Sequence, residues 1–173
     1  LKTVQENFNE VCRMYPLHGV SSLSVKAIRN IVRKREYENV LSMDIKDFFP
    51  SVSSHVLIEA IKAQCGTTPD NENTFDALIK VLFTHNLDSN SDVDQGFLPQ
   101  GAPSSPYLAD IVMFRIDKYL RNYLNKYILG ATYIRYVDNI YVLLPMGTEA
   151  EKVQKLVATT DKKLQDFGLR LNR

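Results

Sequence analysis

The chain of 173 residues is 45% hydrophobic and 24% charged, and its net charge is +1. A chain of this size and composition forms one domain with its own core, which excludes a disordered or collagen-like protein, and the small net charge argues against a simple polyanion-binding module. The sequence shows no signal peptide and no run of the about 18 apolar residues that span a membrane, and its two distant cysteines are typical of reduced thiols, so we expect a cytoplasmic protein without a membrane partner.

The N-terminal part of the chain is predicted to be helical. Apolar residues at helical spacing predict helices over residues 3–15 and 22–35. The second helix carries a basic run without an acidic residue, composed of Lys26, Arg29, Arg33, Lys34 and Arg35. Such a run is either a solvated face or a surface that meets phosphate groups. We interpret residues 1–39 as a partial helical segment and residues 40–173 as the main domain.

The main domain begins with a strand and two helices. An apolar run predicts a buried strand over residues 40–45, which Pro50 ends. A helix is predicted through residues 55–62, and its N-cap is one of three nearby serines, Ser51, Ser53 and Ser54. A further helix is predicted from about residue 74 to residue 85, between polar loops.

The second half of the chain is predicted to hold a long helix and a hairpin. Pro106 lies in the first turn of a helix that extends to about Tyr127. Two short β-rich runs, 132–136 and 140–144, form a hairpin, and Thr148 caps a helix over residues 149–166 that Gly168 ends before a last strand at 169–171. This order predicts an α+β fold, an antiparallel sheet with helices packed on one face.

Two aspartates are the strongest candidates for chemistry. Asp44 and Asp138 each follow an apolar, strand-like run. Carboxylates at neighbouring strand ends can hold Mg²⁺, or Mn²⁺, against a triphosphate, and the backbone carbonyl of Ile45 can add a ligand. Taken singly, Asp44 is equally a residue that terminates a strand. In the same way, Asp138 and Asn139 are ordinary hairpin residues.

A loop rich in proline and serine lies between the two aspartates. It has the sequence Leu-Pro-Gln-Gly-Ala-Pro-Ser-Ser-Pro at residues 98–106 and enters the predicted long helix. Gly101 lets backbone approach a ligand closely, the helix N-terminus attracts anions, and Gln100 can hydrogen-bond a base or a sugar. A proline-rich helix entry without a ligand explains the same composition.

The ordered set of motifs resembles the reverse transcriptase family. Asp-Ile-Lys-Asp-Phe-Phe-Pro-Ser at 44–51 is followed by the 98–106 loop, by Arg-Tyr-Val-Asp at 135–138 and by Gly-Leu-Arg-Leu-Asn at 168–172. These motif sequences are most similar to those of bacterial members, namely retrons, group II introns and their defence-associated relatives. The resemblance covers residues 40–173 well and implies a polymerase palm, with a partial helical fingers segment at 1–39 and no thumb before the end at Arg173.

The resemblance also implies a role for each matched position. Asp44 and Asp138 would be catalytic, metal-binding aspartates with the Ile45 carbonyl, and Asp47 and Phe48 would face the incoming triphosphate. Phe49 matches a bulky gate beneath the sugar that favours deoxynucleotides, and Gln100 with Gly101 matches the nucleotide-contacting segment. Tyr136 and Val137 match residues near the primer end. The implied partners are an RNA or DNA template with its primer, dNTP, an associated noncoding RNA and the thumb of a longer bacterial chain.

One catalytic position departs from the family pattern. The family has two aspartates in its hairpin, and the second is Asn139 here. Asparagine keeps the size and one acceptor oxygen but loses the charge that attracts a metal ion. The sequence therefore supports three functions. The first is an RNA-directed DNA polymerase, the second a catalytically inactive scaffold that binds nucleic acid or protein, and the third, ranked last, a palm-type nucleotide cyclase.

Overall fold

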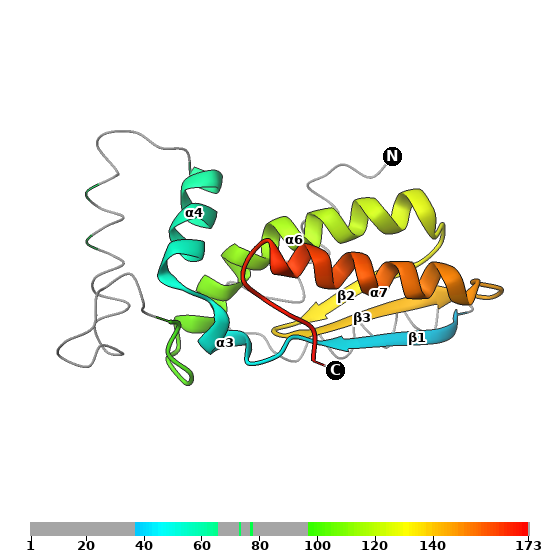
Figure 1. The fold of residues 1–173 in the computed structure, drawn as a ribbon, viewed down its shortest axis with the longest axis horizontal. Helices are drawn as coiled ribbons and strands as arrows, with labels where there is room; N and C mark the ends of the chain where they lie inside the picture. The colour runs from blue at the N-terminus through cyan, green and yellow to red at the C-terminus, as the bar shows by residue number, and fades with distance from the viewer. Residues whose placement is uncertain (1–36, 66–72, 74–76, 78–96, 173) are drawn as a thin grey trace.

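The computed structural model of the protein describes residues 37–65, 73, 77 and 97–172 (Figure 1). The helices predicted over 3–15 and 22–35, with their basic run, lie outside these residues, as does nearly all of the helix predicted over 74–85. No helix in the described ranges combines the length and apolar character that crossing a membrane requires.

The described residues form a three-stranded antiparallel sheet. Its strands are β1 (Tyr37–Asp44), β2 (Thr132–Tyr136) and β3 (Asn139–Pro145), in the order β1-β3-β2. Since β2 and β3 are a hairpin and β1 pairs with β3, the first strand finds its partner far along the chain. Alternation divides β3 between the faces, so that Ile140 and Val142 join the main core while Leu143 packs with Ile134 on the other face.

In the described part of the chain, four helices accompany the sheet, namely α3 (Phe48–Ser51), α4 (Ser54–Cys65), α6 (Ser105–Tyr127) and α7 (Ala150–Gln165). In Figure 1, α6 and α7 lie across the same face of the sheet. The buried residues of α6 recur every three or four positions, which gives the helix one apolar stripe against the core. The stripe comprises Ala109, Val112, Met113, Ile116, Leu120 and Leu124.

The predicted α+β architecture is confirmed, including the long helix and the hairpin. The first strand differs from its prediction, because it begins at Tyr37 and is not buried throughout. Val40 is 57% exposed, since Leu41 and Met43 face the helices and the alternate side chains face away from them.

The cap predicted for the last helix was wrong. The Thr148 hydroxyl donates to the carbonyl oxygen of Pro145 over 2.7 Å, and α7 has Glu149 at its N-cap, without a side-chain capping bond. The hydroxyl therefore closes the turn after β3 instead of satisfying the helix. At α4 the prediction was correct, because Ser53 Oγ accepts a hydrogen bond from the Val56 amide over 3.3 Å.

Candidate active site

The sheet brings the two predicted aspartates to the same strand ends. Asp44 is the last residue of β1 and pairs in register with Asn139, the first residue of β3. The next backbone amide, that of Ile45, donates to the carbonyl oxygen of Asp138 over 3.1 Å. Asp138 itself lies in the two-residue turn between β2 and β3. The end of β1 and the hairpin turn are thus joined directly by backbone hydrogen bonds.

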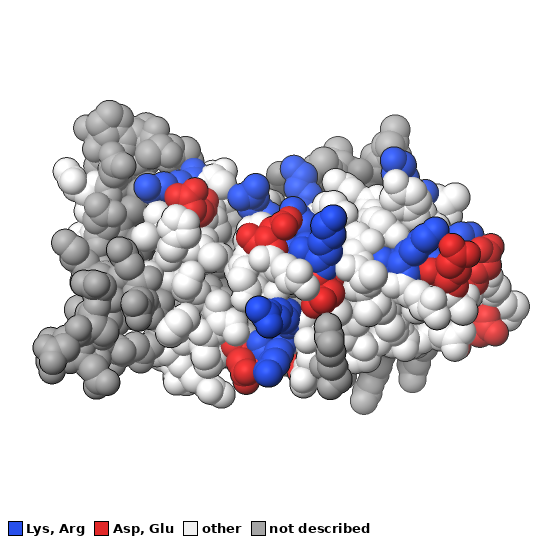
Figure 2. Space-filling view, in the orientation of Figure 1, with Lys and Arg blue, Asp and Glu red and all other residues white. Residues whose placement is uncertain are grey.

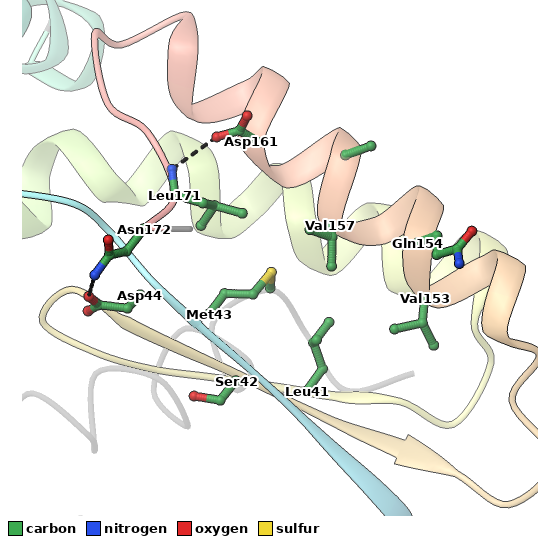
Figure 3. A pocket seen from close by; sticks show the side chains of 11 residues that line it. Leu41, Ser42, Met43, Asp44, Val153, Gln154, Val157, Asp161, Leu171 and Asn172 are labelled. Atoms are coloured by element: carbon green, nitrogen blue, oxygen red, sulfur yellow. Dashed lines mark hydrogen bonds between the residues drawn. The ribbon is translucent and has the colours of Figure 1, made fainter.

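Each of these carboxylates accepts a hydrogen bond from an asparagine side chain. Asn139 Nδ2 donates to Asp138 Oδ1 over 2.8 Å. Asn172 Nδ2 donates to Asp44 Oδ2 over 3.2 Å (Figure 3). Within the described ranges, no donor contacts the second oxygen of either carboxylate. Both aspartates are partly exposed. Hard, accessible oxygens of this kind are the ligand type that a divalent cation of the Mg²⁺ class prefers.

The cluster is smaller than a full triad of carboxylates. Among the described residues, no three His, Cys, Asp or Glu side chains gather as a metal-binding group. Asn139 supplies an amide donor at the position where a third carboxylate would supply charge. The Ile45 side chain is aliphatic and buried, so the ligand role predicted from sequence concerns its backbone carbonyl.

The end of the described chain holds Asp44 from the side opposite β3. Residues 170–172 run antiparallel to residues 44–46, with backbone bonds from Lys46 N to Arg170 O (2.9 Å) and from Asn172 N to Asp44 O (2.8 Å). The Asp161 carboxylate on α7 accepts from the Leu171 amide over 2.9 Å and anchors this segment (Figure 3). A groove of about 710 Å³ between β1 and α7 has Asp44 among its lining residues.

The turn that carries Asp138 has an unusual backbone conformation. Val137 has φ of 54°, while Asp138 is not among the residues with positive φ. Positive φ at only the first of two central residues is the pattern of a type II′ turn, a position that normally requires glycine. A β-branched residue there is strained, and such strain gathers at functional sites.

Beneath the turn lies a buried charge network that the sequence analysis missed. Arg135, only 5% exposed, makes a two-bond ion pair with Asp117, with Nε and Nη2 each 2.9 Å from a carboxylate oxygen. Its Nη1 also donates to Asp110 Oδ1 (2.9 Å) and to the carbonyl oxygen of Val137 (2.8 Å). The Tyr133 hydroxyl donates to Asp117 Oδ1 over 2.6 Å. The signal available in the sequence was an arginine within an apolar strand, together with two aspartates two helical turns apart on α6.

Burial perturbs two acids of this network. Desolvation raises the pKa of Asp110, although the adjacent Arg135 guanidinium acts in the opposite direction. Desolvation, reinforced by the charge of Asp117, raises the pKa of the Tyr133 phenol well above its usual range. The raised pKa favours the protonated phenol, the form that donates the hydrogen bond to Asp117.

The residues predicted to meet a nucleotide lie around α3 and the 98–106 loop. Asp47 is the N-cap of α3 in a left-handed conformation, with φ of 45°. Phe48 is buried in the core, while Phe49 is partly exposed, and their ring centroids are 5.4 Å apart. The start of the loop is tied to the residues after α3, because Leu98 N donates to Val52 O over 3.2 Å.

The loop itself presents its predicted residues to solvent. Gln100 and Gly101 are exposed, and Gly101 has φ of 90°, a conformation that suits glycine alone. The Ser105 hydroxyl donates to the Pro99 carbonyl oxygen over 2.6 Å and fixes the loop to the start of α6. Tyr136, predicted to lie near a primer end, is 55% exposed at the end of β2.

Comparison with known proteins gives a family for this arrangement. The family model "Reverse transcriptase (RNA-dependent DNA polymerase)" matches residues 1–173. The retron Mx65 reverse transcriptase of Myxococcus xanthus is 31% identical over 144 residues, 78% of this chain and 31% of the relative. The retron Ec86 reverse transcriptase of Escherichia coli is 28% identical over 122 residues, 70% of this chain and 31% of the relative. The chain thus spans about a third of the length of these relatives.

A solved structure agrees on the fold. The apo telomerase of Candida tropicalis, truncated from its C-terminal domain, superposes with a TM-score of 0.58 at 13% identity, over 99% of this chain and 34% of the telomerase chain. At this identity the likeness concerns the fold alone. The family match extends over the whole sequence, so it includes every motif discussed above. The chain therefore belongs to the reverse transcriptase family, together with bacterial retron-type members.

Proposed function

We propose that this chain is the fingers–palm part of an RNA-directed DNA polymerase that adds deoxynucleotides to a primer. One observation carries the proposal, namely the register of Asp44 with Asn139 and the Ile45–Asp138 backbone bond, which together put two carboxylates at one edge of the sheet. The family match adds the chemistry that this pair would serve. The template would be RNA or DNA, and the retron-type relatives suggest a noncoding RNA partner and a bacterial cytoplasmic setting.

In this proposal Asp44 and Asp138 would hold Mg²⁺, with Mn²⁺ as a substitute, and the Ile45 carbonyl would add a ligand. The bound ions supply charge neutralisation at the triphosphate and activation of the primer 3′-hydroxyl. The asparagine amides leave one oxygen of each carboxylate available for this task. Because both backbones are fixed by hydrogen bonds on two elements, the carboxylates need little reorganisation when an ion arrives.

The neighbouring residues would position the substrates. The backbone at Asp47 and Phe48 would face the triphosphate, and Phe49 would lie beneath the sugar and exclude a 2′-hydroxyl. Exposed Gln100 and Gly101 would contact the nucleotide from the loop tied to the end of α3. Tyr136 and Val137 would lie beside the primer end.

Primer extension by the full-length protein tests this function. We expect dNTP incorporation with Mg²⁺, and a loss of at least about a thousandfold in Asp44→Asn and in Asp138→Asn, because each removes a charge from the metal site. Asp166→Asn is the matched control, since that carboxylate is exposed and pairs only with Lys163 in the described residues. Incorporation that survives both site substitutions would refute the proposal.

A catalytically inactive scaffold is the second candidate function. One observation favours it. The Asn139 side chain donates a hydrogen bond to Asp138 and contributes no negative charge for metal binding. A scaffold would bind nucleic acid or protein without using the carboxylates. It predicts that Asp44→Ala leaves the biological function of the full-length protein intact, and loss of that function in Asp44→Ala excludes it.

A further inference from the structure

We infer that Arg135 is a positioning residue, whose guanidinium fixes the central peptide of the 137–138 turn and thereby the direction of the Asp138 carboxylate. The inference rests on the proposed function, because it assigns to Asp138 a role in holding a divalent cation. It concerns a residue that touches neither the cation nor the nucleotide. Within the described residues, its guanidinium donates to Asp117, to Asp110 and to the Val137 carbonyl oxygen.

The orientation of its central peptide defines the type of the 137–138 turn. Two-residue hairpin turns of types I′ and II′ differ in the orientation of the peptide between the two central residues. Positive φ at Val137 but not at Asp138 indicates type II′. A flip of the 137–138 peptide would bring Asp138 to positive φ and turn its side chain in another direction. The carbonyl oxygen of this same peptide is the one that Arg135 Nη1 contacts at 2.8 Å.

The Arg135 guanidinium is held rigidly by its hydrogen bonds. Four of its donor contacts are made to three acceptor groups, at 2.8 to 2.9 Å, and the side chain is 4% exposed. Asp117 accepts hydrogen bonds from two nitrogens of the planar guanidinium. Because Asp110 and Asp117 on α6 fix the plane of the guanidinium, Nη1 can reach the turn in one orientation only. Burial then excludes the water that would otherwise take its place.

The conformation of the turn requires an arginine at position 135. Val137 has β-branched geometry at a backbone position that favours glycine, so the turn does not prefer this conformation by itself. An external hydrogen bond must maintain it. Lysine, with one nitrogen on a flexible stem, cannot keep the two-bond ion pair with Asp117 and reach the Val137 carbonyl at the same time.

The experiment measures Mn²⁺ binding by electron paramagnetic resonance in the full-length protein, and single-nucleotide incorporation with active-site titration. One test variant is Arg135→Lys. The other is Tyr133→Phe/Arg135→Met/Asp117→Leu, which replaces the buried charges by apolar groups and so retains a packed core. Tyr133→Phe alone is the matched control, because it removes none of the four hydrogen bonds from Arg135 to Asp117, Asp110 and Val137 described above.

We expect both test variants to bind Mn²⁺ about 10- to 100-fold more weakly and to lose a similar factor in the incorporation rate of each active site, as substitutions behind a metal ligand do. The titrated fraction of active sites stays unchanged, and Tyr133→Phe stays within about twofold in both measurements. A purely structural role predicts the opposite pattern, a smaller active fraction with unchanged Mn²⁺ affinity and rate.

Two outcomes separate this inference from the proposed function. If a folded test variant binds Mn²⁺ with wild-type affinity, the inference is overturned even where the wild type polymerises DNA. If the wild type incorporates no nucleotide but its Mn²⁺ binding requires Asp138 and weakens in the Arg135 variants, the inference stands and the polymerase proposal fails. Circular dichroism identifies the folded variants, and Arg135→Lys serves as the test should the triple variant not fold.

Discussion

The side-chain amide of Asn139 donates a hydrogen bond to Oδ1 of Asp138 across 2.8 Å. This contact orients the carboxylate in the protein without a metal ion, a task that a second carboxylate could not perform because it would repel the first. The asparagine therefore lacks the charge that would attract a cation, but it orders the Asp138 carboxylate in the metal-free site. Substitution at this position should separate the two effects.

Asn139→Asp is expected to weaken the metal-free fold and strengthen metal binding. The lost hydrogen bond and the new repulsion should lower the free energy of unfolding by about 1–2 kcal/mol in the presence of a chelator. Mg²⁺ should then bind about tenfold more tightly, which corresponds to about 1.4 kcal/mol. Thermal unfolding with and without Mg²⁺ measures both quantities, and Asn139→Ala, which should show only the first change, is the control. Equal Mg²⁺-induced shifts in wild type and Asn139→Asp would contradict this prediction.

Gly101→Ala tests the loop beside α3. A methyl group at Gly101 would meet no atom within 4 Å, so its cost arises only from the backbone at φ of 90°. We expect a loss of about 1–2 kcal/mol in stability and a raised KM for dNTP, since the loop conformation near the nucleotide changes. Gly147→Ala is a matched control, because Gly147 has φ of 75° and equal space but follows β3, at the far end of that strand from Asp138. An unchanged KM in Gly101→Ala would argue against a nucleotide contact.

Tyr133→Phe should destabilise the fold by about 1.5–3 kcal/mol, the range for a hydrogen bond to a charged group. The substitution removes the 2.6 Å bond to Asp117 and leaves the aromatic packing in place. Urea unfolding at neutral pH measures the loss. Tyr107→Phe, at a side chain that is 48% exposed, should change stability by less than about 0.5 kcal/mol. Similar values for the two variants would show that the buried bond contributes nothing of its own.

Asp110 should make the stability depend on pH. Burial raises the pKa of Asp110 above its ordinary 3.8, so the folded state binds this proton more tightly than the unfolded state. The stability that this proton contributes is present below pH 3.8 and is lost as pH rises through the raised pKa of the folded state. Asp110→Asn keeps an acceptor for Arg135 without this titration. Relative to the variant, the wild type should therefore lose stability with rising pH, and parallel unfolding curves across this acidic window would exclude the effect.

Local patterns in the sequence predicted most of the described fold. Helical periodicity and Pro106 predicted α6, and two β-rich runs around Asp138 predicted the hairpin, because both elements form from neighbours in the chain. The details that failed have one local and one distant cause. Thr148 has the composition of a cap, but its hydroxyl bonds to Pro145, and the exposed Val40 follows from the way β1 meets the helices.

The sequence predicted the two aspartates of the candidate site but not the residues that hold them in place. Asp44 and Asp138 were identified by their motifs, and their adjacency follows from a strand register that no local pattern contains. Arg135 belonged to a recognised motif, yet its partners Asp110 and Asp117 lie on another element and had no assigned role. Side chains that hold a ligand in place are visible only once the elements have been packed together.

The pairing of β1 with late parts of the chain has a consequence for biosynthesis. Tyr37 meets Thr132 across 95 residues, and Asp44 meets Asn172 across 128. A ribosome that adds about 5–20 residues per second needs on the order of ten seconds to supply these partners. Throughout that interval Leu41 and Met43 have no sheet to join, and the nascent strand is a ready substrate for chaperones. Synonymous codons that slow translation before the hairpin would lengthen this exposure and lower the yield of folded protein.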